Sequence, residues 1–222
     1  MLNILRNVIY KNFVDNISFG YYKALNLLRK FTFQGKEFRY LTHKYNFTWR
    51  NERSVEIPII RDIVRKNRNL KILEVGNVLS HYYKINHDIL DKYEVARGVI
   101  NEDVASYNPK QKYDLIVSIS TFEHVGWDEK PRENYKIRRA ISNLKSILSK
   151  NGKIIFTFPV GYNKHIDEIV KKNKLNLTSA SFLKRTSRLN KWEECSYKEI
   201  SNFKYNYPFG NANAIMVATI VK

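Results

Sequence analysis

Apolar residues along the chain fall into short runs and longer periodic stretches. The short runs at 72–75, 115–119 and 153–160 contain β-branched residues, which is typical of strands that are covered on both faces. Residues 133–149 repeat apolar side chains on one helical face, and residues 1–30 come close to the same spacing. This mixture of buried strands and amphipathic helices favours an α/β fold.

Local signals suggest where some of these elements begin and end. A helix is predicted from Pro58 to Lys66, because proline suits the first turn of a helix. Asn151 and Gly152 are predicted to end the helix at 133–149 and to lead into the next strand. Residues 212–222 are apolar and β-branched, so they predict one further strand.

Residues 31–56 are rich in aromatic and charged side chains. Apolar aromatic residues alternate over 45–49, which predicts a strand. One interpretation is a cap over an active site, in which Trp49 or Arg53 contacts an acceptor. The other, which we favour, is an accessory layer over a sheet edge.

The N-terminal residues 1–30 carry charged residues between their apolar positions. They contain no uncharged run long enough to span a membrane and no cleavage pattern of a signal peptide, so we expect a cytoplasmic protein. A basic amphipathic helix leaves a peripheral membrane contact open, but packing on the domain or on a partner is the more common outcome.

Composition narrows the class of protein. The 222 residues are 43% hydrophobic, enough for one domain with a sizeable core. A single cysteine, Cys195, excludes an internal disulfide framework and fits a reducing compartment. The net charge of +18 indicates attraction to an anionic partner: nucleic acid, a phospholipid surface, or a phosphate-bearing substrate. It does not choose among them.

The segment 71–82 joins a buried strand to a tight turn. Glu74 stands near the end of the strand, and Gly76 follows, where a missing Cβ lets the backbone turn and approach a ligand. The segment resembles the first motif of the class I S-adenosylmethionine (SAM) dependent methyltransferases, an acidic residue followed by a glycine-rich turn. Only one of the family's glycines is present. The resemblance implies that Glu74 and Gly76, with Asn77 and Ser80, contact SAM, and that a helix follows the turn.

Two acidic residues further along fit the same resemblance. Asp91 comes 17 residues after Glu74, close to the spacing at which nucleotide-binding βαβ units place a ribose-binding carboxylate. Glu94 is the alternative. Asp103, beside Val104, stands where class I methyltransferases hold the adenine amino group.

The segment 114–128 carries the residues expected to do chemistry. Ser118 and Thr121 lie around the carboxyl end of a predicted strand, where open α/β sheets bind ligands. Glu123-His124-Val125 resembles the "EHV" that follows strand four in many small-molecule and glycan methyltransferases. We expect His124 to act as a base, with Asp128 and Glu123 as alternates.

Other signatures are absent. The Asp/Asn-Pro-Pro-Tyr/Phe motif of enzymes that methylate exocyclic or amide nitrogens does not follow strand four, and no zinc spacing, P-loop or serine-nucleophile elbow occurs. Trp49, Trp127 and Tyr162 are candidates for stacking on a sugar ring.

The resemblance therefore implies a SAM-dependent methyltransferase with a Rossmann-like, mostly parallel sheet of about seven strands, an antiparallel last strand, and helices on both faces. Residues 1–55 are expected to form an extension or cap, and residues 56–222 the methyltransferase domain. A hydroxyl of a sugar, glycan or other small molecule is the favoured acceptor, because no separate RNA-binding module is visible. An RNA methyltransferase and a non-catalytic binding protein on a degenerate methyltransferase fold remain alternatives.

Overall fold

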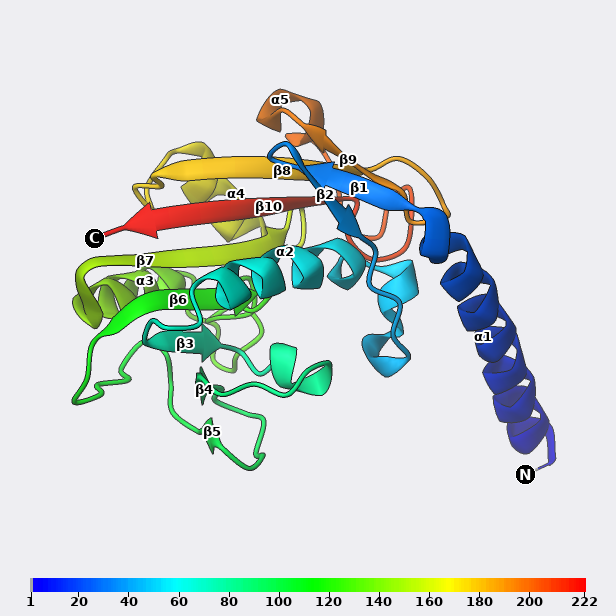
Figure 1. Ribbon diagram of the computed structural model, residues 1–222, viewed down its shortest axis with the longest axis horizontal. Coiled ribbons are helices and arrows are strands. Elements are labelled where there is room, and N and C mark those ends of the chain that lie inside the picture. Colours follow the sequence, from blue (N-terminus) through cyan, green and yellow to red (C-terminus); the bar gives the residue numbers. More distant parts are fainter. Residues whose placement is uncertain (1) are drawn as a thin grey trace.

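A computed structural model describes residues 2–222, with side chains described from residue 13 onward. Its centre is an eight-stranded sheet with the spatial order β5-β4-β3-β6-β7-β10-β8-β9 (Figure 1). The strands are β3 (Ile72–Val75), β4 (Asp88–Leu90), β5 (Val99–Ile100), β6 (Tyr113–Ile119), β7 (Leu148–Pro159), β8 (Ser179–Arg185), β9 (Trp192–Cys195) and β10 (Ala214–Val221).

The strand directions match the expected fold. The neighbours from β5 to β7 all run parallel, whereas β10 is antiparallel to both β7 and β8. The Rossmann-like α/β fold with an antiparallel last strand is therefore confirmed. An additional strand, β9, pairs antiparallel with β8 and forms one edge of the sheet.

Helices cover both faces of the sheet (Figure 1). α2 (Arg53–Lys66) packs on one face, and α3 (Lys136–Ser146) and α4 (Lys164–Lys171) pack on the other. The central strand β6 supplies both cores: Leu115 and Val117 belong to the core under α2, while Ile116 belongs to the core under α3. This alternation is the period of two that a strand buried on both faces requires. The short helix α5 (Tyr197–Ile200) follows β9.

The N-terminal segment packs onto the α2 face and onto the β9 edge. The long helix α1 (Leu2–Leu28) extends away from the sheet (Figure 1) and is followed by a two-stranded sheet, β1 (Lys30–Phe33) and β2 (Lys36–Arg39). The helical prediction for residues 1–30 is thus confirmed. Among the described residues, no helix combines the length and the apolar character that crossing a membrane requires.

The strand predicted over 45–49 is wrong. This segment forms a 3₁₀ helix, η1 (Tyr45–Arg50), in which Asn46 and Phe47 have positive φ angles that an extended strand does not allow. Trp49 is buried: its ring packs edge-on against Phe19, and its Nε1 donates a hydrogen bond to Ser18 Oγ at 3.2 Å. It is therefore not available to stack on a sugar.

Other element boundaries also differ from the predictions. α2 begins five residues before Pro58. Proline has no N–H to donate to the Ser54 carbonyl one turn earlier, and this carbonyl accepts a 2.9 Å hydrogen bond from the Leu41 amide instead. Asn151 and Gly152 lie inside β7, not in a turn. The helix expected after Gly76 is only the short 3₁₀ helix η2 (Leu79–His81), and the buried Glu74 carboxylate accepts the amides of Val78 and Leu79 at its start.

Candidate active site at the carboxyl ends of the strands

A pocket of about 490 Å³ lies where β3, β4 and β6 end. This is the edge at which open parallel sheets bind ligands. Seven of the twelve predicted site residues line it: Gly76, Asn77, Asp91, Asp103, Val104, Thr121 and His124. The other five, Glu74, Ser80, Ser118, Glu123 and Asp128, lie outside its lining.

Gly76 allows two strand ends to approach each other. Its φ of +88° lies in the left-handed region, its N–H donates to Leu90 O at 2.8 Å, and a Cβ at this position would overlap Thr121 Oγ1. Glycine is therefore required by the turn and by the close contact between the β3 and β6 loops. The same contact brings Thr121 to the pocket wall.

Glu74 supports this loop from beneath. It is fully buried, and its Oε1 accepts hydrogen bonds from the N–H groups of Val78 at 3.0 Å and Leu79 at 2.8 Å. Its Oε2 pairs with His87 Nε2 at 2.8 Å. Glu74 thus shapes the loop and does not face the pocket.

Asp91 connects the ends of β3 and β4. Its Oδ2 accepts the N–H of Asn77 at 3.0 Å, and its Oδ1 accepts those of Tyr93 and Glu94 at 2.9 and 2.8 Å. Since a carboxylate has about four acceptor positions, one position on Oδ2 remains for a ligand hydroxyl. Glu94 also lines the pocket, and its Oε1 accepts from Asn77 Nδ2 at 2.6 Å. Ser80 Oγ donates to Asn77 Oδ1 and so acts on the pocket only through that side chain.

Asp103 belongs to a cluster of charges on the β5 side of the pocket. Burial raises the pKa of its carboxyl, but hydrogen bonds from Lys136, Lys92 and the Ala105 amide outweigh this effect and lower the pKa to about 2. Both lysines also pair with Glu129, which lines the pocket. Apolar walls from Leu90, Val104 and Val125 adjoin these charges. Glu129 and both lysines come from loops and α3, and no motif in the sequence indicated them.

Buried carboxyls lie behind the end of β6. Glu56 Oε1 accepts from Ser120 Oγ at 2.6 Å, and Glu123 is almost completely buried. Desolvation raises the pKa of both carboxyls. Arg53 lies nearby, lines the pocket, and donates to the carbonyls of Ile119 and Ser120 at 2.7 and 3.2 Å. Ser118 is buried, and its Oγ donates to Val75 O at 3.0 Å.

His124 is half-exposed at the pocket rim. Its Nδ1 is hydrogen-bonded to Asp128 Oδ2, which also accepts the Tyr162 hydroxyl at 2.7 Å. Although burial raises the pKa of Asp128, the hydrogen bonds from His124 and Tyr162 lower it below its usual value. An ionised carboxylate only accepts, so in a neutral imidazole Nδ1 carries the proton and Nε2 has the lone pair. Nε2 lies 3.6 Å from Glu123 Oε1, beyond hydrogen-bond distance.

Comparisons with known proteins give matches in structure only. No protein-family model matches the chain, and no curated protein matches it in sequence. The N-methyltransferase NodS from Bradyrhizobium japonicum WM9, solved with S-adenosyl-L-homocysteine, is 11% identical at a TM-score of 0.43, over 78% of this chain and 93% of that one. A SAM-dependent methyltransferase from Thermotoga maritima is 15% identical at a TM-score of 0.40, over 68% of this chain and 82% of that one.

The sugar N-methyltransferase KedS8 from Streptoalloteichus is 15% identical at a TM-score of 0.34, over 46% of this chain. The match spans 47% of the KedS8 chain, so less than half of that protein has a counterpart here. Identities and TM-scores this low say nothing about what the present chain binds. Its chemistry has to be derived from its own pocket.

Proposed function

We propose that this chain, which has the fold of class I SAM-dependent methyltransferases, uses SAM to methylate a hydroxyl group of a sugar or of another hydroxylated small molecule. The observation that carries the proposal is the His124–Asp128 pair at the rim of the strand-end pocket. A hydroxyl must lose its proton when it is methylated, and an imidazole held in this tautomer accepts one.

The pocket residues fit SAM in kind. The volume of about 490 Å³ lies within the usual range for small-molecule sites. Asp91 keeps an acceptor position that suits a ribose hydroxyl, and Leu90, Val104 and Val125 offer apolar walls that suit an adenine ring. The acidic lining also attracts a positively charged ligand.

Asp103 is the candidate for the adenine amino group, as the resemblance implies. Its Oδ1 accepts only the Ala105 amide at 2.9 Å and so keeps a further acceptor position, whereas its Oδ2 is engaged by two lysines. The lysines keep the carboxyl ionised, which preserves it as an acceptor.

When bound, SAM supplies a methyl group on a positively charged sulfonium. The chain's own residues bind and orient the acceptor and move its proton. His124 Nε2 takes up the hydroxyl proton, and the Asp128 carboxylate stabilises the imidazolium that results. Tyr162 fixes the Asp128 carboxylate through its hydroxyl, and its ring packs edge-on against His124 at 5.0 Å between centroids.

The test is transfer of a labelled methyl group from SAM. The purified protein is incubated with a panel of nucleotide-linked and lipid-linked sugars and, separately, with total RNA. We expect label on a sugar hydroxyl. Label on RNA alone would overturn the acceptor assignment. Absence of SAM binding by calorimetry would overturn the enzymatic assignment and favour a binding protein.

A further inference from the structure

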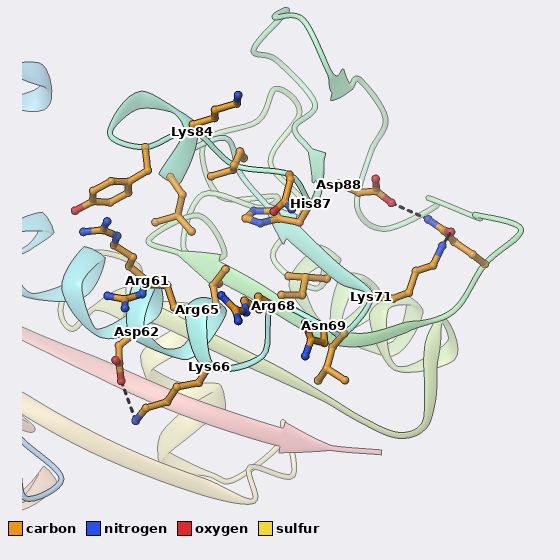
Figure 2. Close-up of a pocket in the computed structure, with 18 residues that line it drawn as sticks. Arg61, Asp62, Arg65, Lys66, Arg68, Asn69, Lys71, Lys84, His87 and Asp88 are labelled. Atoms are coloured by element: carbon orange, nitrogen blue, oxygen red, sulfur yellow. Dashed lines mark hydrogen bonds and ion pairs between the residues drawn. The ribbon is translucent and has the colours of Figure 1, made fainter.

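A second hollow, of about 850 Å³, lies beside the C-terminal half of α2 (Figure 2). We call it the basic groove, because its lining includes Arg61, Arg65, Arg68, Lys71 and Lys84. It shares no lining residue with the strand-end pocket. Figure 2 shows the arginines arising from α2 and the segment after it, and Lys84 from the loop before β4.

The groove is open because the connection from β3 to β4 contains little helix. Parallel strands are usually joined by a crossover helix that covers the sheet, but here the connection contains only the three residues of η2. The flank of α2 is left open as a result. The apolar side chains of Val64, Ile72, Leu79 and Ile85 form part of the lining between the cations.

Among the side chains that the structure describes, from residue 13 onward, none of these five cations forms an ion pair with an acidic residue. The two acidic residues of the lining have other partners: Asp62 pairs with Lys36 at 2.6 Å and Lys66 at 3.0 Å, and Asp88 accepts from Tyr113 at 2.8 Å and Gln111 at 2.7 Å. Cations outnumber acidic residues in the lining, so the groove concentrates an excess of positive charge in a concave site.

A structural role explains only part of this charge. Cations in the last turn of a helix stabilise its negative end, and Arg65 and Lys66 occupy that turn of α2. Arg61 lies a turn earlier, and Lys71 and Lys84 belong to other segments. Their convergence on one hollow is not required by the helix.

We propose that the basic groove binds a small organic diphosphate. Several separated cations suit a ligand with more than one phosphate, since guanidinium groups bind phosphate oxygens in pairs. The volume lies within the small-molecule range, and the apolar lining suits an organic moiety. A flat bilayer fits a concave site poorly. A single RNA strand needs open aromatic faces, but Arg61 already covers the ring of Tyr83 at 3.6 Å from its centroid.

The test measures binding, so it does not depend on methyl transfer and fails separately from the proposed function. Inorganic pyrophosphate and uridine diphosphate are titrated into the full chain by calorimetry at two salt concentrations. We expect saturable 1:1 binding that weakens with salt. The double substitution Arg65→Gln/Arg68→Gln should weaken it about tenfold or more, because each removes a charged hydrogen-bond donor.

The matched control is Lys174→Gln/Lys198→Gln, which removes the same charge from exposed positions just after α4 and within α5. Pyrophosphate and uridine diphosphate affinity should stay within about twofold of the unmodified protein. Equal weakening in the control would overturn the proposal, because net charge alone would then account for binding. A second outcome would also overturn the proposal. In it, neither diphosphate binds, but a short single-stranded RNA or phosphatidylglycerol vesicles bind, and this binding is lost in Arg65→Gln/Arg68→Gln.

Discussion

The Asp128 carboxylate holds the His124 imidazole by its Nδ1 atom at the rim of the strand-end pocket, and Nε2 lies 3.6 Å from Glu123 Oε1. If His124 is the base, His124→Gln should lower the turnover of a hydroxyl acceptor by about 10²- to 10⁴-fold, the usual contribution of general-base catalysis. SAM affinity should stay within about twofold. Steady-state kinetics at saturating substrate, with calorimetry for SAM, give both values.

Asp128→Asn is the companion variant. It retains the shape of the side chain but removes the charge that stabilises the imidazolium, and a charged hydrogen bond is worth about 1.5 to 3 kcal/mol. We expect a loss of turnover of roughly 10- to 100-fold, smaller than that of His124→Gln. Near-full turnover in both variants would show that neither residue takes part in proton transfer.

Asp91 should affect both the cofactor and the loop. Asp91→Asn replaces one carboxylate oxygen, a hydrogen-bond acceptor, by an NH₂ group that faces either the Asn77 amide or the ligand. The free energy of SAM binding should therefore weaken by about 1 to 3 kcal/mol. Hydrogen exchange at the amides of Asn77, Tyr93 and Glu94 should also accelerate. Asp114→Asn is a matched control, because this carboxylate accepts from the Lys71 amide and from Ser149 outside the pocket. SAM affinity unchanged by Asp91→Asn would remove Asp91 from the site.

Gly76→Ala should destabilise the chain and weaken SAM binding. The φ of +88° costs about 1 to 3 kcal/mol for a residue with a Cβ, and the added methyl group would overlap Thr121. Adding Thr121→Ala should restore part of the lost free energy of unfolding, because it removes the overlap. The backbone strain at position 76 should remain. Urea denaturation of the two single variants and the double variant measures this coupling. Full additivity of the two substitutions would mean that the predicted overlap does not occur.

Asp167 gives a pH dependence of stability. Burial raises the pKa of its carboxyl from 3.8 to about 6, although the Gly161 amide, at 3.1 Å, lowers it in part. Between these values the folded state holds a proton that the unfolded state has lost, so stability falls as pH rises. The loss should total about 3 kcal/mol and be complete by about pH 7.

Asp167→Asn keeps the shape of the side chain but removes the group that titrates. The difference in free energy of unfolding between the two proteins should therefore change steadily from about pH 4 to pH 6.5. Denaturant titrations at a series of pH values measure it. A constant difference across this range would contradict the raised pKa.

The sheet was predictable from the sequence because its strands are buried on both faces. Largely apolar runs such as 115–119, which only Ser118 interrupts, are typical of such strands. The segment 45–49 is not a strand, because its alternating aromatic residues include Trp49, which packs against α1. Tertiary contacts there overrode the local pattern.

The site was predictable only where a motif marks a strand end. Gly76 and Asp91 follow β3 and β4 directly, His124 lies five residues after β6, and all three line the pocket. Glu74 and Ser118 also lie at strand ends, but their side chains turn to backbone partners. Spacing along a chain fixes which edge of the sheet a residue occupies, whereas hydrogen bonds from other segments decide where its side chain points. The basic groove had no signal beyond the net charge, because its cations come from segments brought together by a short connection.

The position of β10 bears on how this chain assembles. β10 separates β7 from β8 in the sheet, yet it is made after both of them. Until it inserts, β7 and β8 each present an open edge on the ribosome or in a partly folded chain, and such edges pair readily with other strands. Molecules caught at this stage are thus exposed to aggregation at two edges that the finished sheet conceals.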